Sequence, residues 1–444
     1  MTETMQASSS PRESVRRVAL ASMVGTSIEW YDFFIFGTAS ALVFGRLFFP
    51  TFSELAGTLA AFASFAVGFV ARPVGGLVFG HFGDRLGRKT TLIITLTMMG
   101  LATFAMGLMP GYATIGVWAP ILMVVLRFVQ GLAVGGEWGG AVLMATEHAG
   151  GKQLGFFGSF AQVGSAVGGL LSTGMFLLMQ QLPEEDFVSW GWRVPFLVSI
   201  VLVLVGLFIR LRIMESPVFE KIKESRRVVK VPVVELLRSD TRNVLLAAGL
   251  YCAHGVLFYA MTVYTLAYTT SAYGLERNTY LIGVTAAGAG QLITIPLLGA
   301  LSDKLGRRPV MIFGTLFIIA FAIPLNFLIT SQVPLLMWLA VVVSICVGHN
   351  SVYSPTAALY SEMFPAHVRY SGASLGYQLG GAIAGFVPLV AASLVGAAGG
   401  AYWPIAAIIA LGGFVGFVCI LLVRPAVAAP GAPRASSLTA RTGA

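Results

Sequence analysis

Charged residues are scarce in this chain of 444 residues. Asp, Glu, Lys and Arg make up 11% of it, whereas an ordinary globular domain contains about 25%. A soluble fold could not bury the apolar surface, because 57% of the residues are hydrophobic and the mean hydropathy is +0.83. The composition excludes a soluble enzyme, a nucleic-acid binder and a disordered chain. It indicates an all-α membrane protein that crosses the bilayer many times.

Cysteines and enzyme motifs are also scarce. The three cysteines, Cys252, Cys346 and Cys419, lie in apolar stretches, so neither a disulfide framework nor a zinc site is supported. Because no H-E-x-x-H or P-loop pattern is present, we expect no metal, no cofactor and no enzymatic activity. Residues 1–17 are polar, and the first apolar run contains Glu29 and Asp32, so this run is not a signal-peptide core.

Apolar runs separated by turn and charge signals predict about twelve membrane spans. Six spans, a polar gap and six more spans divide the chain into a cytoplasmic segment 1–17, a bundle 18–212, a cytoplasmic linker 213–242, a bundle 243–423 and a disordered tail 424–444. Within the linker, residues 220–230 could form an amphipathic helix on the inner leaflet. The predicted spans are 18–44, 57–80, 90–109, 118–146, 155–181, 192–212, 243–271, 280–301, 309–329, 334–361, 371–396 and 402–423.

The placement of basic residues predicts the orientation in the membrane. If the first span runs outward, most of the 28 Lys and Arg residues, Arg210 included, fall in the inner segments. Only Arg46, Arg193 and Arg277 fall outside, and Arg72 and Arg127 lie within spans. By the positive-inside rule, both termini are expected in the cytoplasm of a bacterial inner membrane. The net charge of +9 therefore reflects membrane topology and does not indicate a nucleic-acid partner.

A loop motif recurs at the same place in both halves. GHFGDRLGRK at 80–89 follows the second span, and GALSDKLGRRP at 299–309 follows the eighth. A charged turn that merely ends a helix would explain the basic residues, but not the repeated Asp, the glycines and their spacing. The recurrence indicates that the two halves are duplicated.

With this loop, the chain resembles the major facilitator superfamily and, more narrowly, its metabolite–proton symporter family. The resemblance implies two pseudo-symmetric bundles of six helices that work by alternating access, and a monomer is expected. Similar family members carry shikimate, α-ketoglutarate, citrate, proline or glycine betaine. The narrower match is carried by EWYDFFIFGTAS at 29–40, the stretch 62–89, RFVQGLAVGGEWGGAVLMATEH at 127–148, GWRVPF at 191–196, ESPVFEK at 215–221 and EMFPAHVRYSGASLGYQ at 362–378.

Ionisable residues inside spans are expensive, by about 2.5–3.5 kcal/mol each, and usually mark a transport path. The resemblance places spans one and four at the central cavity. Arg127 is therefore expected to bind a substrate carboxylate with its planar fork, and Glu29, Asp32 or Glu137 to carry the coupled proton. A static set of ion pairs, Arg127 with Asp32 and Arg72 with Glu137, stays open as the alternative.

Charged residues at the cytoplasmic ends of the spans form a second set. In the superfamily, the repeated loop makes charge contacts that hold the halves together while the site faces outward, and each exposed pair contributes only about 0–1 kcal/mol. Simple anchoring of positive loops inside is the alternative. The residues expected to contribute to gating are Arg72, Asp84, Arg85, Arg88, Glu147, Asp303, Arg307, Arg308, Glu362 and Arg369.

Polar and aromatic side chains in the spans are expected to complete the substrate pocket around Arg127. For any one of them, a bond to a neighbouring helix is the alternative. His254 is either a protonation switch or a packing histidine. The other expected pocket residues are Tyr31, Gln130, Gln162, Tyr251, Gln291, Asn350, Tyr353 and Gln378.

The sequence therefore predicts a proton-coupled importer of a small organic acid of the shikimate, α-ketoglutarate or dicarboxylate type. One alternative is uptake of a zwitterion such as proline or glycine betaine. Residues 425–444 are rich in Ala, Pro and Gly and lack the heptads of osmosensing family members, which counts against that alternative. Another is a non-transporting sensor, which would not need to keep Glu29, Asp32 and Arg127 in the membrane.

Overall fold

The computed structural model describes residues 11–52, 54–86, 88–149, 153–212, 236, 238, 240–365 and 368–423. In this part of the chain all regular elements are helical, and 12 segments are long and apolar enough to cross a membrane. The predicted spans are confirmed to within about one helical turn at each end. They are Val15–Phe48, Leu59–Phe79, Lys89–Leu108, Trp118–Glu147, Leu154–Met179, Gly191–Leu211, Thr241–Tyr273, Asn278–Leu305, Arg307–Thr330, Pro334–Met363, Arg369–Ala397 and Trp403–Leu422.

Several spans consist of more than one helical element. The first six spans and their connections contain α1 (Pro11–Ala39), η1 (Ser40–Phe44), α2 (Gly45–Phe48), α3 (Glu54–Leu86), α4 (Arg88–Leu108), α5 (Tyr112–Ile115), α6 (Trp118–Gly135), α7 (Trp138–Ala149), α8 (Leu154–Met179), α9 (Glu184–Ser189), η2 (Gly191–Arg193) and α10 (Val194–Arg212). The last six contain α13 (Thr241–Tyr259), η3 (Ala260–Tyr264), α14 (Thr265–Tyr273), α15 (Arg277–Leu305), α16 (Arg307–Thr330), α17 (Pro334–Val343), η4 (Ser344–His349), α18 (Asn350–Met363), α19 (Arg369–Gly385), α20 (Val387–Ala397) and α21 (Trp403–Leu422).

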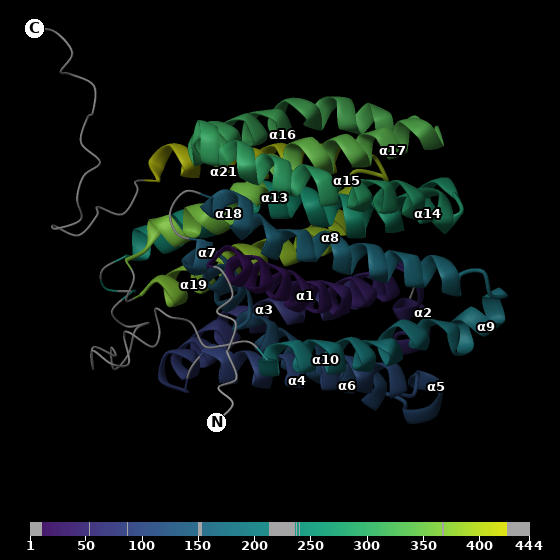
Figure 1. Cartoon of the computed structure of the whole chain (residues 1–444). Helices are drawn as coiled ribbons and strands as arrows, with labels where there is room; N and C mark the ends of the chain where they lie inside the picture. The colour runs from purple at the N-terminus through teal and green to yellow at the C-terminus, as the bar shows by residue number, and fades with distance from the viewer. Residues whose placement is uncertain are drawn as a thin grey trace, which may run out of the picture.

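The long helices run side by side in one bundle (Figure 1). The purple to teal helices of the first half occupy the lower part of the view, and most of the green to yellow helices of the second half the upper part. The labels α2, α5, α9 and α14 gather at one end, which we call the α9 end, and α7 and α19 lie toward the other, which we call the α19 end. Apolar side chains such as Leu204, Phe208 and Ile293 are exposed on the outside, as a lipid-facing surface requires.

Several helix pairs join the first six spans to the last six, among them α8 with α18 and α7 with α19. Helix α8 packs along α15, and α3 packs along α19. Most of the predicted linker 213–242, including the helix expected at 220–230, lies outside the described residues, as do segment 1–10 and the tail 424–444. The division of the chain into two bundles therefore stays a prediction.

Turns of π-helix interrupt spans one, seven and ten, at η1, η3 and η4. Such turns leave a backbone carbonyl without its usual helical donor and are frequent at functional sites. At the end of η3, the Ala260 carbonyl oxygen accepts both the backbone N–H of Thr265 and its hydroxyl, the latter at 2.8 Å. The turn η3 begins directly after Tyr259, and the turn η4 ends at His349. Both residues are buried. These irregularities therefore help to set the direction of the side chains at the centre of the bundle.

Candidate functional site

Charged side chains are buried only in the first six spans, among the residues that the structure describes. We call the buried charged residues the charged cluster, and electrostatic interactions connect them to one another. Each is at most 7% exposed, so none can be stabilised by bulk water, and each needs a partner within the protein. The charged cluster consists of Glu29, Asp32, Arg72, Arg127, Glu137 and Arg210.

Arg127 lies on α6 where this helix packs along α3, and its side chain reaches α1. Its guanidinium lies over the rings of Phe36 at 4.2 Å and Phe65 at 5.1 Å, which are favourable cation–π positions. There is space for it because residue 68 is glycine, and an added Cβ at Gly68 would lie 2.6 Å from Arg127 Nε. Nη1 donates to Gln130 Oε1, while Nε is buried without a hydrogen-bond partner. Arg127 thus keeps donor capacity for an anion.

A chain of hydrogen bonds joins Arg127 to Asp32. After Arg127 donates to Gln130, Gln130 Nε2 donates to Thr103 Oγ1 at 2.8 Å. The Thr103 hydroxyl then donates to Asp32 Oδ2, also at 2.8 Å. The alternative of a direct ion pair between Arg127 and Asp32 is therefore wrong for this conformation, because Gln130 and Thr103 lie between them. No signal in the sequence distinguishes Thr103 from other threonines in apolar helices.

Glu29 and Arg72 share a small cavity with Arg127 and Gln130. Its volume is about 10 Å³, enough for about one water molecule. Glu29 Oε2 is buried without a hydrogen-bond partner, and the Arg72 guanidinium lies over Phe69 at 4.5 Å. Arg72 was expected with the gating residues, but the structure places it at the centre, because α3 carries it opposite α1 and α6.

Glu137 forms an ion pair with Arg210 on α10, and not with Arg72 as the alternative set proposed. Arg210 was counted among the inner loop residues, yet it is 7% exposed and lies within the bundle. Gly25 makes this possible, because an added Cβ there would lie 2.7 Å from Arg210 Nη2. Although Arg210 lies near the end of its span, the rotation of α10 turns its side chain inward, toward Glu137.

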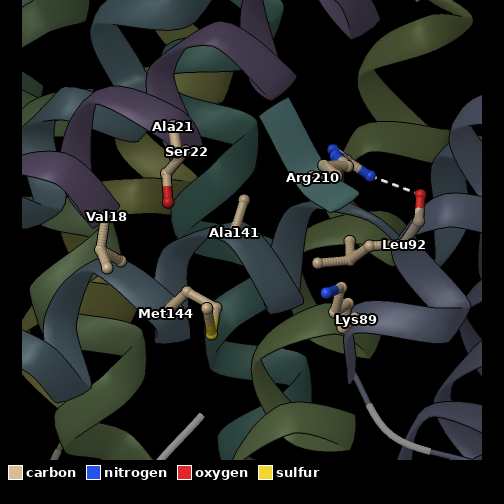
Figure 2. Close-up of a pocket in the computed structure, with 8 residues that line it drawn as sticks. All are labelled: Val18, Ala21, Ser22, Lys89, Leu92, Ala141, Met144 and Arg210. Carbon is tan, nitrogen blue, oxygen red and sulfur yellow. Dashed lines mark hydrogen bonds between the residues drawn. The ribbon is translucent and has the colours of Figure 1, made fainter. Parts of the chain in front are cut away.

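A mostly apolar cavity lies beside this ion pair, between α1, α4, α7 and α10 (Figure 2). Its volume is about 40 Å³, which would hold about three water molecules. Arg210 also donates to the Leu92 carbonyl oxygen at this cavity. The cavity therefore gives room for water beside the guanidinium of the pair. The cavity is lined by Val18, Ala21, Ser22, Lys89, Leu92, Ala141, Met144 and Arg210.

The second half contributes buried polar groups that carry no fixed charge. Asn350 connects three of them: Gln291 Nε2 donates to its Oδ1 at 3.0 Å, its Nδ2 donates to Thr294 Oγ1 at 2.6 Å, and His349 Nδ1 lies 2.9 Å from Oδ1. Gln291 on α15 holds the Asn350 side chain on α18 by a hydrogen bond, and Asn350 in turn positions the ring of His349. His349 and Thr294 were not among the expected pocket residues.

His254, Tyr353 and Tyr377 surround the same region with polar atoms that have no partner. His254 Nε2 and the hydroxyls of Tyr353 and Tyr377 are buried and lack a hydrogen bond to the described residues. The His254 ring lies 4.6 Å from that of Tyr251 and 5.1 Å from that of Tyr353. Tyr251 itself shares a hydrogen bond of 3.1 Å with Tyr259. Unpaired buried donors of this kind are available to a polar ligand.

Three of the expected pocket residues instead bond helix to helix. Tyr31 donates to the Pro195 carbonyl oxygen at 2.7 Å. Gln162 donates to the Tyr353 carbonyl oxygen at 3.0 Å, and Gln378 to the Gly135 carbonyl oxygen at 3.3 Å. The latter two bonds connect the two halves. A side chain that satisfies a backbone group in this way holds helices together.

Aromatic rings pack between α1 and α13 at the level of Glu29 and Asp32. Phe33 packs against Tyr259 with ring centroids 5.6 Å apart, and Trp30 and Phe34 pack against Phe258 at 5.9 and 5.6 Å. These contacts join α1 to α13. Beyond them lies a cavity of about 620 Å³ between the ends of spans one, two and seven. It is lined by Ser40, Ala41, Leu42, Val43, Gly45, Arg46, Phe49, Pro50, Phe52, Gly57, Ala267, Thr270 and Ser271.

The α19 end is closed by contacts between the halves. Asp303 on α15 accepts hydrogen bonds from the backbone N–H groups of Gly155 and Phe156, both at 2.9 Å, at the start of α8. Within the second half, Arg307 pairs with Asp303 at 2.6 Å and with Glu362 at 3.3 Å and so holds Asp303 in place. Tyr370 donates to the Gly136 carbonyl oxygen. The molecule is therefore shut at the α19 end and hollow at the α9 end.

The remaining gating residues are placed as follows. Arg308 is exposed, Glu147 is half-buried at the end of α7, and Arg369 donates to the Phe364 carbonyl oxygen of its own loop at 3.1 Å. The side chains of Asp84, Arg85 and Arg88 lie outside the described part of the chain. The structure therefore describes contacts only for the loop of the second half, where Asp303, Arg307 and Glu362 lie together as expected.

The fold and the buried cluster define a membrane transporter, and comparisons with known proteins identify its family. A family model for sugar (and other) transporters matches residues 18–232, and one for the major facilitator superfamily matches residues 250–442. The inner membrane metabolite transport protein YhjE of Escherichia coli K12 is 44% identical over 86% of this chain and 89% of its own. The chain belongs to the major facilitator superfamily and is a transporter of metabolites.

The names of other similar proteins refer to different solutes. The shikimate transporter of Escherichia coli K12 is 42% identical over 92% of this chain and 94% of its own. The proline/betaine transporter of Salmonella typhimurium is 36% identical over 86% and 78%. The proton:xylose symporter XylE bound to 6-bromo-6-deoxy-D-glucose has a TM-score of 0.74 at 18% identity, covering 93% of this chain and 95% of XylE. This last likeness shows the fold alone.

Proposed function

We propose that this chain is a proton-coupled symporter that imports a small organic acid of the shikimate, α-ketoglutarate or dicarboxylate type. Its termini lie in the cytoplasm of a bacterial inner membrane, so the closed α19 end faces inward. The cavity of about 620 Å³ at the α9 end then admits substrate from outside. The protein works as a monomer, by alternating access of its two halves, without a cofactor.

The hydrogen-bonded chain from Arg127 to Asp32 carries this proposal. Arg127 offers a fixed positive charge with an unpaired Nε, which suits a carboxylate. Asp32 accepts a single hydrogen bond, from Thr103 to Oδ2, and its Oδ1 has no partner, so the charged carboxylate is weakly stabilised and suits proton binding. Since the two groups are joined through only Gln130 and Thr103, occupancy of one site can influence the other.

The aromatic rings next to Arg72 and Arg127 favour an acid over a zwitterion as the substrate. A quaternary ammonium group is usually held over aromatic faces. Here Arg72 lies over Phe33 and Phe69, and Arg127 lies over Phe33, Phe36 and Phe65. These ring faces are already occupied by the guanidinium groups of Arg72 and Arg127 and are not free for a substrate ammonium group. The unpaired tyrosine hydroxyls of the second half suit a substrate that also carries hydroxyl or carbonyl oxygens.

Proton movement into vesicles tests the function directly. The purified chain is placed in lightly buffered, de-energised vesicles, and shikimate, α-ketoglutarate, citrate, succinate, proline and glycine betaine are added in turn. We expect the external pH to rise with one of the acids. Arg127→Ala should abolish the response, because a carboxylate inside the protein would lose its counter-charge. Tyr31→Phe is the matched control, since Tyr31 bonds only the Pro195 backbone.

The pattern of responses separates the alternatives. A response to proline or betaine alone would establish the zwitterion transporter in place of the acid transporter. A chain that is folded but responds to none of the six solutes would contradict the proposal and favour a sensor. A full response from Arg127→Ala would exclude Arg127 as the carboxylate ligand.

A further inference from the structure

Thr103 lies between the group that would bind the substrate and the group that would bind the proton. Its Oγ1 is 2.8 Å from Gln130 Nε2, 2.8 Å from Asp32 Oδ2 and 3.0 Å from the Met99 carbonyl oxygen of its own helix. It is fully buried, at 0% exposure, so water does not compete for these bonds. A hydroxyl with three polar neighbours must choose among them.

The chemistry of the neighbours limits that choice. Arginine can only donate, so Gln130 turns its carbonyl oxygen to Arg127 and its NH₂ group to Thr103. Thr103 must therefore accept from Gln130. Its single hydrogen remains for one of two acceptors, the Asp32 carboxylate or the Met99 carbonyl.

Protonation of Asp32 changes which acceptor is available. While Asp32 is a carboxylate, it accepts the Thr103 hydrogen, and all the bonds from Arg127 to Asp32 point in one direction and polarise one another. When a proton from the outer solution binds Asp32 Oδ2, the new O–H donates to Thr103 Oγ1. The Thr103 hydrogen then turns to the Met99 carbonyl. No other bond is formed or broken.

We propose that Thr103 is a positioning residue that makes the affinity of Arg127 for a substrate carboxylate depend on the protonation of Asp32. With Asp32 charged, the polarised chain draws Arg127 toward Gln130. With Asp32 neutral, this attraction weakens, and Arg127 is released to bind the substrate. Protonation of Asp32 and binding of the substrate therefore strengthen each other. This inference rests on the proposed function and deepens it, because it names the element that couples the two occupants.

Other charged groups around Asp32 act through space and do not need Thr103. Tyr31 on α1, Arg127 on α6 and Glu137 after α6 interact with Asp32 directly. Further groups interact with Glu137 or Arg127 and so belong to the same network: Glu29 on α1, Arg72 on α3, Arg210 on α10 and Tyr259 on α13. Direct attraction between Asp32 and Arg127 would also make substrate binding stronger when Asp32 is neutral. The experiment must therefore separate the hydrogen-bonded route from simple charge interaction.

Substitution of Thr103 by valine separates them, because valine keeps the shape and removes the hydroxyl. Binding of the acid that gave proton movement in the vesicle assay, with shikimate as the first probe, is measured on the full chain at a mildly acidic and a mildly alkaline pH. We expect the wild type to bind more tightly at acidic pH. Thr103→Val should lower that ratio of affinities by about 10-fold, since hydrogen bonds to charged groups have about this weight or more.

Two further variants and one double variant complete the test. Thr103→Ser restores a hydroxyl and should restore the pH dependence. Thr97→Val is the matched control on the same helix, because the Thr97 hydroxyl bonds only the Ile93 carbonyl oxygen of its own helix, at 2.8 Å, and it should behave as the wild type. In an Asp32→Asn background, Thr103→Val should have no further effect on the pH dependence, because its route to the proton is already absent.

Each other result overturns the inference. An undiminished pH dependence in Thr103→Val would show that through-space charge interaction is sufficient. Equal weakening at both pH values, without rescue by Thr103→Ser, would show that Thr103 only packs. A folded wild-type chain that binds and moves protons with none of the six solutes would overturn the proposed function and this inference with it.

Discussion

The two halves of the molecule bury different kinds of polar group. Within the described residues, the first six spans bury Glu29, Asp32, Arg72, Arg127, Glu137 and Arg210, whereas the last six bury histidine, asparagine, glutamine, hydroxyl and tyrosine side chains and no acid, lysine or arginine. Both sets meet at the centre, where Phe33 on α1 packs against Tyr259 on α13. Charge and neutral hydrogen bonding are therefore contributed from opposite sides of one interface.

This difference indicates a division of labour. Buried charges are expensive, and those of the first half interact with one another, most directly in the ion pair of Glu137 and Arg210. Such groups are suited to bind a proton and an anion. The second half offers unpaired neutral groups such as the Tyr353 hydroxyl, which can distinguish one uncharged part of a substrate from another. The proposed proton chemistry thus belongs to one half and much of the selectivity to the other.

The largest expected effect comes from removing one charge of the buried pair in the first half. Arg210→Gln leaves Glu137 without a counter-charge and should lower the stability of the folded chain by about 3–5 kcal/mol. Thermal unfolding of the protein in detergent would measure it. The control is Arg46→Gln, which breaks the exposed pair with Glu184 at 2.9 Å and should cost no more than about 1 kcal/mol. Equal effects of the two substitutions would mean that burial of the pair contributes little.

A smaller effect is expected in the second half. Tyr353→Phe removes a buried hydroxyl that has no partner, so the fold should tolerate it, while KM should rise by about 2- to 10-fold, the equivalent of one hydrogen bond. Tyr360→Phe, on the same helix, is the control, because the Tyr360 hydroxyl bonds the Ala247 backbone. It should lower stability and leave KM unchanged. If KM is instead the same in Tyr353→Phe and the wild type, this hydroxyl does not contact substrate.

The smallest effect is expected at the contact that joins the halves. Asp303→Asn keeps an oxygen near Gly155 and Phe156 but removes its negative charge at the start of α8. A charge at a helix N-terminus contributes about 0.3–1 kcal/mol, so the population with the α19 end open should increase by up to about 5-fold. Accessibility of single cysteines introduced at that end would report it. Arg308→Gln, in an exposed position, should leave the population unchanged, and a shift of the same size there would indicate a general charge effect.

The spans, the charged residues within them and the repeated loop were predictable because each is a local property. Hydropathy over about 20 residues determines whether a segment can cross a bilayer, and all the predicted spans are present. Glu29, Asp32, Arg127 and Glu137 stand out for the same reason, as charges in apolar runs. The loop at Asp303 and Arg307 was identified by its repeat, and its contact with Glu362 is confirmed.

The partners of these residues were not predictable. Arg210 lies only two residues from the end of its helix, so its position along the chain suggests a loop residue, although helix rotation turns it toward Glu137. Thr103 and His349 belong to residue types that are ordinary in membrane helices, and only the neighbours of each reveal a function. Tyr31 and Gln378 have the right chemistry for a pocket, but backbone carbonyls of other helices already accept their hydrogen bonds.

The amino-acid sequence by itself determined that this protein is a bundle of membrane helices with charges at its centre, since the free energy of placing each residue in lipid depends on that residue and its near neighbours. Only the tertiary structure decided that Arg127 reaches Asp32 through Gln130 and Thr103, that Glu137 pairs with Arg210, and that one end is closed. These facts depend on how helices distant in sequence rotate and pack against one another. A hydrogen bond needs its two atoms within about 3 Å, and only the packed helices define distances on that scale.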